Sequence, residues 1–161
     1  MHKLYLSAIL DLCDRRIVSF AIRDANDTAL VHSTLDQALE TNPGVHLLLH
    51  SDRGAYTTQI FHDKLTAAGI TQSMSRVGKC TDNGPMEGFW GLLKRERYYG
   101  RRFTSRAELV KMIPGSTLPI TTSAASSADW AYGLLWRSMT AYWPHKDLYL
   151  LCMVGRQKFH A

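Results

Sequence analysis

The chain opens with two short apolar runs separated by a polar turn. Residues 3–12 and 16–22 are rich in aliphatic, β-branched and aromatic side chains, and Asp14-Arg15 stands between them. Runs of this length and composition on either side of a turn are typical of β-strands. The pattern therefore predicts a β-hairpin at the start of the chain.

Helical and strand patterns alternate from there to about residue 100. After Asp27-Thr28, a suitable helix N-cap, apolar residues recur at helical spacing until Asn42-Pro43-Gly44 ends the pattern. The later segments predict a strand at 45–49, a helix at about 57–68, a strand at 70–74, a loop at 75–79, and a helix from about 85 to 98–100. The predicted order is β, β, α, β, α, β, α, which indicates an α/β domain.

The character of the sequence changes at Pro114. Residues 114–128 are dominated by Ser, Thr and Ala with Pro and Gly, a composition typical of a linker. Three tryptophans follow, but their spacing builds no clear amphipathic face. We therefore expect residues 1–113 to form one domain and residues 114–161 to be an atypical, poorly ordered tail.

Composition excludes several classes of protein. With 45% apolar and 20% charged residues, the chain has the balance of a soluble globular protein. It contains no run of about 18 apolar residues, so we expect no membrane partner and a cytoplasmic location. Cys13, Cys80 and Cys152 are too far apart for a Cys-x-x-Cys metal or redox pair. The net charge of +5 permits nucleic-acid binding without requiring it.

Two carboxylates stand where folds commonly hold chemistry. Asp52 directly follows a predicted buried strand, and Glu87 falls 35 positions later in the first turn of a predicted helix. Oxygen ligands suit a hard cation such as Mg²⁺, and a pair of such ions can drive phosphodiester chemistry. Each residue also has an ordinary structural explanation, since Asp forms turns and Glu favours the positive end of a helix.

Three segments resemble a single family. His50-Ser51-Asp52-Arg53-Gly54 and the run from Thr81 to Glu96 resemble the second-Asp and Glu motifs of the DDE transposases of insertion sequences, whose catalytic core is like that of retroviral integrases. Residues 5–18 resemble the second and third strands of that core. The motifs occur in the family's order and with its spacing from Asp to Glu, over about 110 residues.

The resemblance implies an RNase H-like fold, a mixed sheet flanked by helices. It also implies Mg²⁺ or Mn²⁺ as cofactor, and the joining of transposon ends to target DNA by two-metal phosphoryl transfer. Carried over to this chain, Asp52 and Glu87 would be catalytic metal ligands. Basic residues after the Glu motif would contact DNA phosphates, namely Lys94, Arg95, Arg97, Arg101 and Arg102, with Tyr98 and Tyr99 interleaved.

The family's first catalytic Asp is not found in this sequence. It would lie on the central strand that precedes the one beginning near Leu4, so we expect the sheet to lack that strand and to expose two interior edges. Asp11 belongs to the following strand, where we expect it to hydrogen-bond at the strand end. With two of three carboxylates, the chain alone is expected to have little strand-transfer activity, and whether it is an enzyme stays open.

The tail also departs from the family, which continues with a helix rich in Tyr, Asn and Arg. Residues 116–126, read across codon boundaries, can encode such a segment, Tyr-Ile-Ala-Tyr-Tyr-Asn-Lys-Arg-Arg-Gln. This suggests a frameshift near Ile113, which the coding DNA would test.

Two other functions remain open at this point. One is a non-catalytic DNA-binding protein, or one that associates with a full-length transposase or with a second copy of itself. The other is an unrelated nuclease that uses Asp11, Asp52 and Glu87, which requires the three carboxylates to converge.

Overall fold

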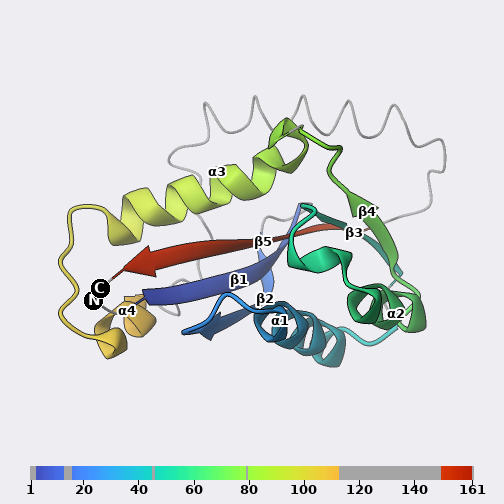
Figure 1. Cartoon of the computed structure of the whole chain (residues 1–161), viewed down its shortest axis with the longest axis horizontal. Helices are drawn as coiled ribbons and strands as arrows, with labels where there is room; N and C mark the ends of the chain where they lie inside the picture. The colour runs from blue at the N-terminus through green and yellow to red at the C-terminus, as the bar shows by residue number, and fades with distance from the viewer. Residues whose placement is uncertain (1–2, 13–15, 45, 79, 113–149, 161) are drawn as a thin grey trace.

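The computed structural model describes residues 3–12, 16–44, 46–78, 80–112 and 150–160 (Figure 1). The main elements are β1 (Lys3–Asp11), β2 (Ile17–Arg23), α1 (Thr28–Thr41), β3 (Leu47–Ser51), α2 (Gln59–Ala67), β4 (Thr71–Met74), α3 (Gly84–Leu93), α4 (Arg106–Met112) and β5 (Leu150–His160). Short 3-10 turns cover Ala55–Thr57 and Cys80–Asn83, and one π-helical turn covers Lys94–Tyr98. Within these ranges no helix is long and apolar enough to cross a bilayer.

The predicted order of elements from the hairpin to the third helix is confirmed, and local chemistry explains the boundaries. Asp27 caps α1 by accepting a hydrogen bond from the Leu30 amide at 2.9 Å. Thr58 caps α2 in the same way, and Gly69 ends it with a φ of 71°. The helix at 106–112 was not predicted, and the third predicted helix continues beyond Leu93 as the π-helical turn.

The strands form a single sheet in the order β2-β1-β5-β3-β4, so β5 is central. β5 pairs antiparallel with all of β1, from Lys3 opposite His160 to Asp11 opposite Cys152. On its other side it pairs parallel with β3, from Leu47 opposite Leu150 to Ser51 opposite Val154. Figure 1 shows this red strand between blue β1 and cyan β3, with α3 on one face of the sheet and α1 and α2 on the other.

The position between β1 and β3 is the one in which a central strand was expected to be missing. The expectation of two unpaired interior edges is therefore wrong, because residues 150–160 fill that position and pair with both neighbours. These eleven residues, which the sequence analysis placed in the tail, form strand β5. The predicted linker at 114–128 and the three tryptophans lie outside the described residues.

Two apolar clusters hold the helices to the sheet. The cluster beneath α3 and α4 consists of Leu4, Leu6, Ala8, Leu10, Met86, Phe89, Trp90, Leu93, Leu109 and Phe159. The cluster beneath α1 and α2 consists of Ile9, Val31, Leu35, Leu49, Tyr56, Phe61, Leu65 and Ile70. β1 gives Leu4, Leu6, Ala8 and Leu10 to the first cluster and Ile9 to the second, so the strand is covered on both faces.

Phe159 tests whether β5 belongs to the core in solution. Its side chain is fully buried and its ring meets that of Tyr98 edge-on at 5.3 Å. We expect Phe159→Ala to lower the free energy of unfolding by about 3–5 kcal/mol, the cost of removing a buried aromatic ring. Lys158→Ala, on the other face of the same strand and exposed, should cost less than about 1 kcal/mol. Equal, small effects in urea denaturation would contradict the central placement of β5.

Candidate functional site

Asp52 follows the carboxyl end of β3. Leu47 and Leu49 of this strand belong to the cluster beneath α1 and α2, so the alternate positions, which Asp52 continues, face α3. Asp52 is half-buried, and its Oδ1 accepts a hydrogen bond from the Gly54 amide at 2.9 Å. The carboxylate is therefore fixed at the end of the strand rather than free to rotate.

Glu87 stands in the first turn of α3, on the same side of the sheet. Met86, Phe89, Trp90 and Leu93 turn towards the sheet and are buried, which leaves Glu87 exposed at the amino end of the helix. Apolar residues at this spacing fix the rotation of the helix about its axis. The sequence-predicted pair thus consists of a half-buried Asp and an exposed Glu, both on the α3 face.

An ion pair that the sequence analysis missed closes the loop between β4 and α3, the helix that carries Glu87. Arg76, just after β4, donates Nε and its own amide to Oδ2 of Asp82, at 2.9 and 3.0 Å, and Nη2 to Oδ1 at 2.9 Å. These hydrogen bonds hold the pKa of Asp82 well below its usual range. We call this pair the Arg76–Asp82 clamp; it fixes the approach to α3 from the sheet.

His50 and its neighbours continue the connection beneath the clamp. His50 is buried, and its Nδ1 and Nε2 lie 3.0 and 3.1 Å from the hydroxyls of Ser73 and Ser75. Burial is the main cause that lowers its pKa, so the ring is neutral at pH 7. Arg53 Nε donates to the carbonyl of Ser75 at 3.0 Å. His50 is therefore a satisfied core histidine that joins β3 to the end of β4.

The residues present do not complete the metal site that the DDE motif implies. Among the described residues, no three His, Cys, Asp or Glu side chains are arranged to hold a metal ion. Asp11 is buried on β1, opposite Cys152 of β5, and shares the face of Ile9 rather than that of Asp52. The three-carboxylate nuclease that would use Asp11 is thus contradicted. Asp52 and Glu87 supply oxygen ligands of the right kind, but without a third.

The predicted basic residues lie at and beyond the carboxyl end of α3. Arg95, Arg101 and Arg102 are exposed, while Lys94 and Arg97 are half-buried. In the part of the chain that the structure describes, none of these five has an ion-pair partner. We call them the basic segment. The two interleaved tyrosines differ in burial: Tyr98 is packed against the core and Tyr99 is exposed.

Tyr98 points inward and Tyr99 outward. The Tyr98 hydroxyl donates to the carbonyl of His160 at 2.9 Å and lies 3.2 Å from the His160 amide, and its ring stacks on Phe103. Tyr99 is 62% exposed. Only Tyr99 is therefore available to a ligand, and Tyr98 instead fixes the basic segment to the end of β5.

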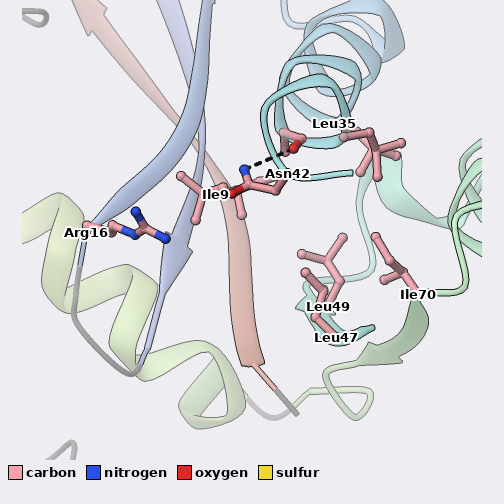
Figure 2. A pocket seen from close by; sticks show the side chains of 10 residues that line it. Ile9, Arg16, Leu35, Asn42, Leu47, Leu49 and Ile70 are labelled. Atoms are coloured by element: carbon pink, nitrogen blue, oxygen red, sulfur yellow. Dashed lines mark hydrogen bonds between the residues drawn. The ribbon is translucent and has the colours of Figure 1, made fainter. Parts of the chain in front are cut away.

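A cavity of about 30 Å³ on the opposite face of the sheet has no features of a site. Figure 2 shows its lining, which comes from β1, α1 with its C-cap, β3 and the residues before β2 and β4: Ile9, Arg16, Leu35, Asn42, Leu47, Leu49 and Ile70. Asn42 Nδ2 is already bonded to the Ala38 carbonyl at 3.1 Å. A nearly apolar space of this size is a packing defect between helix and sheet.

Comparison with known proteins identifies the domain. Residues 1–80 match the family described as integrase core domain. The chain carries an integrase core of the insertion-sequence transposase kind. It is 40% identical over 110 residues to the putative transposase InsK of insertion sequence element IS150 from Escherichia coli K12, matching 67% of this chain and 39% of that protein.

Other relatives agree. A transposase-like protein of Haemophilus influenzae is 39% identical over 112 residues, which are 69% of this chain and 52% of that protein. The matched part of this chain therefore spans about two fifths to half of the length of these curated relatives. Among solved structures, the intasome of simian T-cell lymphotropic virus in complex with the PP2A regulatory subunit B56 gamma aligns with 81% of this chain and 40% of its own. The TM-score of 0.52 at 22% identity confirms the RNase H-like fold.

The Arg76–Asp82 clamp should make part of the stability of this integrase core depend on pH. The pKa of Asp82 is lower in the folded protein than in the unfolded chain. The ionised carboxylate therefore stabilises the folded state fully above the ordinary pKa of about 3.9, and this contribution is lost as the pH falls towards the folded pKa. We expect Asp82→Asn to lower the free energy of unfolding by about 1 kcal/mol at pH 7. The difference from the unmodified protein should shrink below about pH 4.

Denaturant titrations between pH 3 and 7 measure this difference. Asp63→Asn, which removes the same charge from the exposed surface of α2, is the matched control and should cost less than about 0.5 kcal/mol. A difference between Asp82→Asn and the unmodified protein that is the same at every pH would show that the clamp's carboxylate charge is not responsible.

Proposed function

We propose that the chain acts in DNA transposition as the catalytic-core part of an insertion-sequence transposase, and that it contacts DNA through the basic segment. The supporting observation is the position of that segment. It continues from the same helix that carries Glu87, and it holds five cations without ion-pair partners in the described part of the chain. DNA bound there would lie along α3 and run towards the acidic pair.

The packing around Tyr98 supports this placement of the DNA. Tyr98 is bonded to the main chain of β5 and is packed on Phe103 and Phe159, so the basic segment has a fixed path over the sheet. Cations held in place lose little conformational freedom when they bind phosphate. Tyr99, exposed beside them, is available to stack on an unpaired base.

We further propose that Asp52 and Glu87 are the two acidic members of the catalytic site and that the chain does not join DNA strands by itself. The family uses a divalent metal, Mg²⁺ or Mn²⁺, to supply the charge stabilisation for phosphoryl transfer. Two carboxylates without a third ligand among the described residues provide an incomplete set for that purpose. The frameshift origin of the tail stays a prediction for the coding DNA.

Salt-dependent DNA binding tests the basic segment. We expect the double variant Arg101→Gln and Arg102→Gln to bind a labelled duplex more weakly, and the slope of log K against log salt to fall by about 2, since two phosphate contacts are lost. The matched control is the double variant Arg23→Gln and Lys64→Gln, which removes the same charge near the α1 and α2 face. Equal slopes for both double variants in fluorescence anisotropy would rule out a specific role for the segment.

A strand-joining assay tests the proposed lack of activity. The chain is mixed with labelled transposon ends, target DNA and Mn²⁺, and no joined product is expected above background. Robust joining that disappears in Asp52→Ala or Glu87→Ala would overturn this part of the proposal while confirming the assignment of the acidic pair.

A further inference from the structure

The residue of β5 that lies level with Asp52 is Gly155. The parallel register places Val154 opposite Ser51, so the next position of β5 lies beside Asp52, while the antiparallel register places Gly155 opposite Ala8. Ala8 and Phe159 both belong to the cluster beneath α3, so by strand alternation position 155 faces the helix that carries Glu87. The register therefore puts position 155 on the α3 face of the sheet beside Asp52, and glycine supplies no carboxylate there.

The next residue, Arg156, brings a positive charge to Asp52 from the other face of the strand. Its Nη1 donates to Oδ1 of Asn26 at 2.7 Å, and its guanidinium carbon lies 5.6 Å from the centre of the Tyr56 ring. A Cβ added to Gly54 would stand 2.7 Å from Nη2 of Arg156 and 3.2 Å from Oδ1 of Asp52. The guanidinium and the carboxylate are therefore within about 6 Å of each other, a distance at which opposite charges interact appreciably near a protein surface.

These contacts also fix the guanidinium. It is held on one side by Asn26, from the loop before α1, and it packs over the ring of Tyr56, which is fully buried. Gly54 leaves room for the guanidinium, which would have to shift to accommodate a Cβ at position 54. The positive charge beside Asp52 is thus a built feature of the fold rather than a mobile surface cation.

We propose that β5 restores the sheet while removing the metal site: Gly155 leaves the third ligand position without a carboxylate, and Arg156, held by Asn26, places a positive charge close to Asp52. This rests on the proposed role of Asp52 and Glu87 as the acidic pair. A hard divalent cation binds according to the number and charge of its oxygen ligands, and a guanidinium nearby opposes it. The chain therefore binds divalent cations weakly, and position 155 is where a carboxylate completes the site.

Titration of Mn²⁺, followed by electron paramagnetic resonance at constant ionic strength, tests this with the full chain. We expect Gly155→Asp to tighten Mn²⁺ binding by about tenfold or more, and Arg156→Gln by a few-fold. The matched controls are Gly155→Asn, which has the same shape without the charge, and Arg156→Lys, which keeps the charge. Neither control should change the affinity, and Asp52→Asn should abolish the gain made by Gly155→Asp.

Two results would overturn the proposal. One is tight binding of Mn²⁺ by the unmodified chain that depends on Asp52, and the other is the same affinity for Gly155→Asp and Gly155→Asn in folded proteins. If Gly155→Asp fails to fold, as circular dichroism would show, the comparison of Arg156→Gln with Arg156→Lys decides. DNA binding without metal is measured on the same variants, so a failure of the DNA-binding proposal is seen separately from a failure here.

Discussion

The structure depends on the main-chain pairing of β5 with β1 on one side and β3 on the other. Without it the hairpin and the β3-β4 pair would each present a row of unpaired amides and carbonyls in the middle of the fold, at a high cost in free energy. The pairing of β1 with β5 also supports both apolar clusters. Phe159 of β5 belongs to the cluster beneath α3 and α4, and Ile9 of β1 belongs to the cluster beneath α1 and α2. An RNase H-like fold in this chain is thus completed by a strand that begins 76 positions after the end of β4 (150 − 74), the preceding strand of the sheet.

The same arrangement determines how the acidic pair is held. Asp52 is fixed by the end of β3 and by the Gly54 amide, and Glu87 by the rotation that the apolar face of α3 imposes on the helix. The Arg76–Asp82 clamp and the bonds of His50 connect these two supports through the end of β4. The positions of the two carboxylates are therefore set by hydrogen bonds between loops, in addition to the packing of strands and helices.

The elements from the hairpin to α3 were predictable because each carries its own periodicity and its own capping or turn residues. Helix α4 and strand β5 were not. In β5 the apolar run from Leu150 to Val154 is followed by Gly155 and polar residues, with no alternation to mark a strand. Its partners are edges that exist only once the rest of the sheet has formed, so no local pattern could reveal the pairing.

The site was predictable to the same extent. The motifs located Asp52 and Glu87 and the basic segment. They gave no sign that Tyr98 would turn inward, that Asp82 would be bound by Arg76, or that a guanidinium would lie beside Asp52. Arg156 stands 104 positions after Asp52 in the chain, and only the register of β5 brings them together.

Main-chain hydrogen bonds explain how fold and site can separate in this way. The ladder between β5 and its neighbours requires extended backbone and suitable burial of alternate side chains, and it is indifferent to whether one position carries a carboxylate, a glycine or an arginine. A metal site has the opposite requirement, since it depends on the charge and reach of a few particular side chains. A strand of almost any suitable composition can therefore fill the gap in the sheet, while only one with an acid at the position beside Asp52 can fill the gap in the site. The fold and the family are accordingly evident from this chain, while the metal site that we propose to be lost depends on the residue at position 155 and on the charge that follows it.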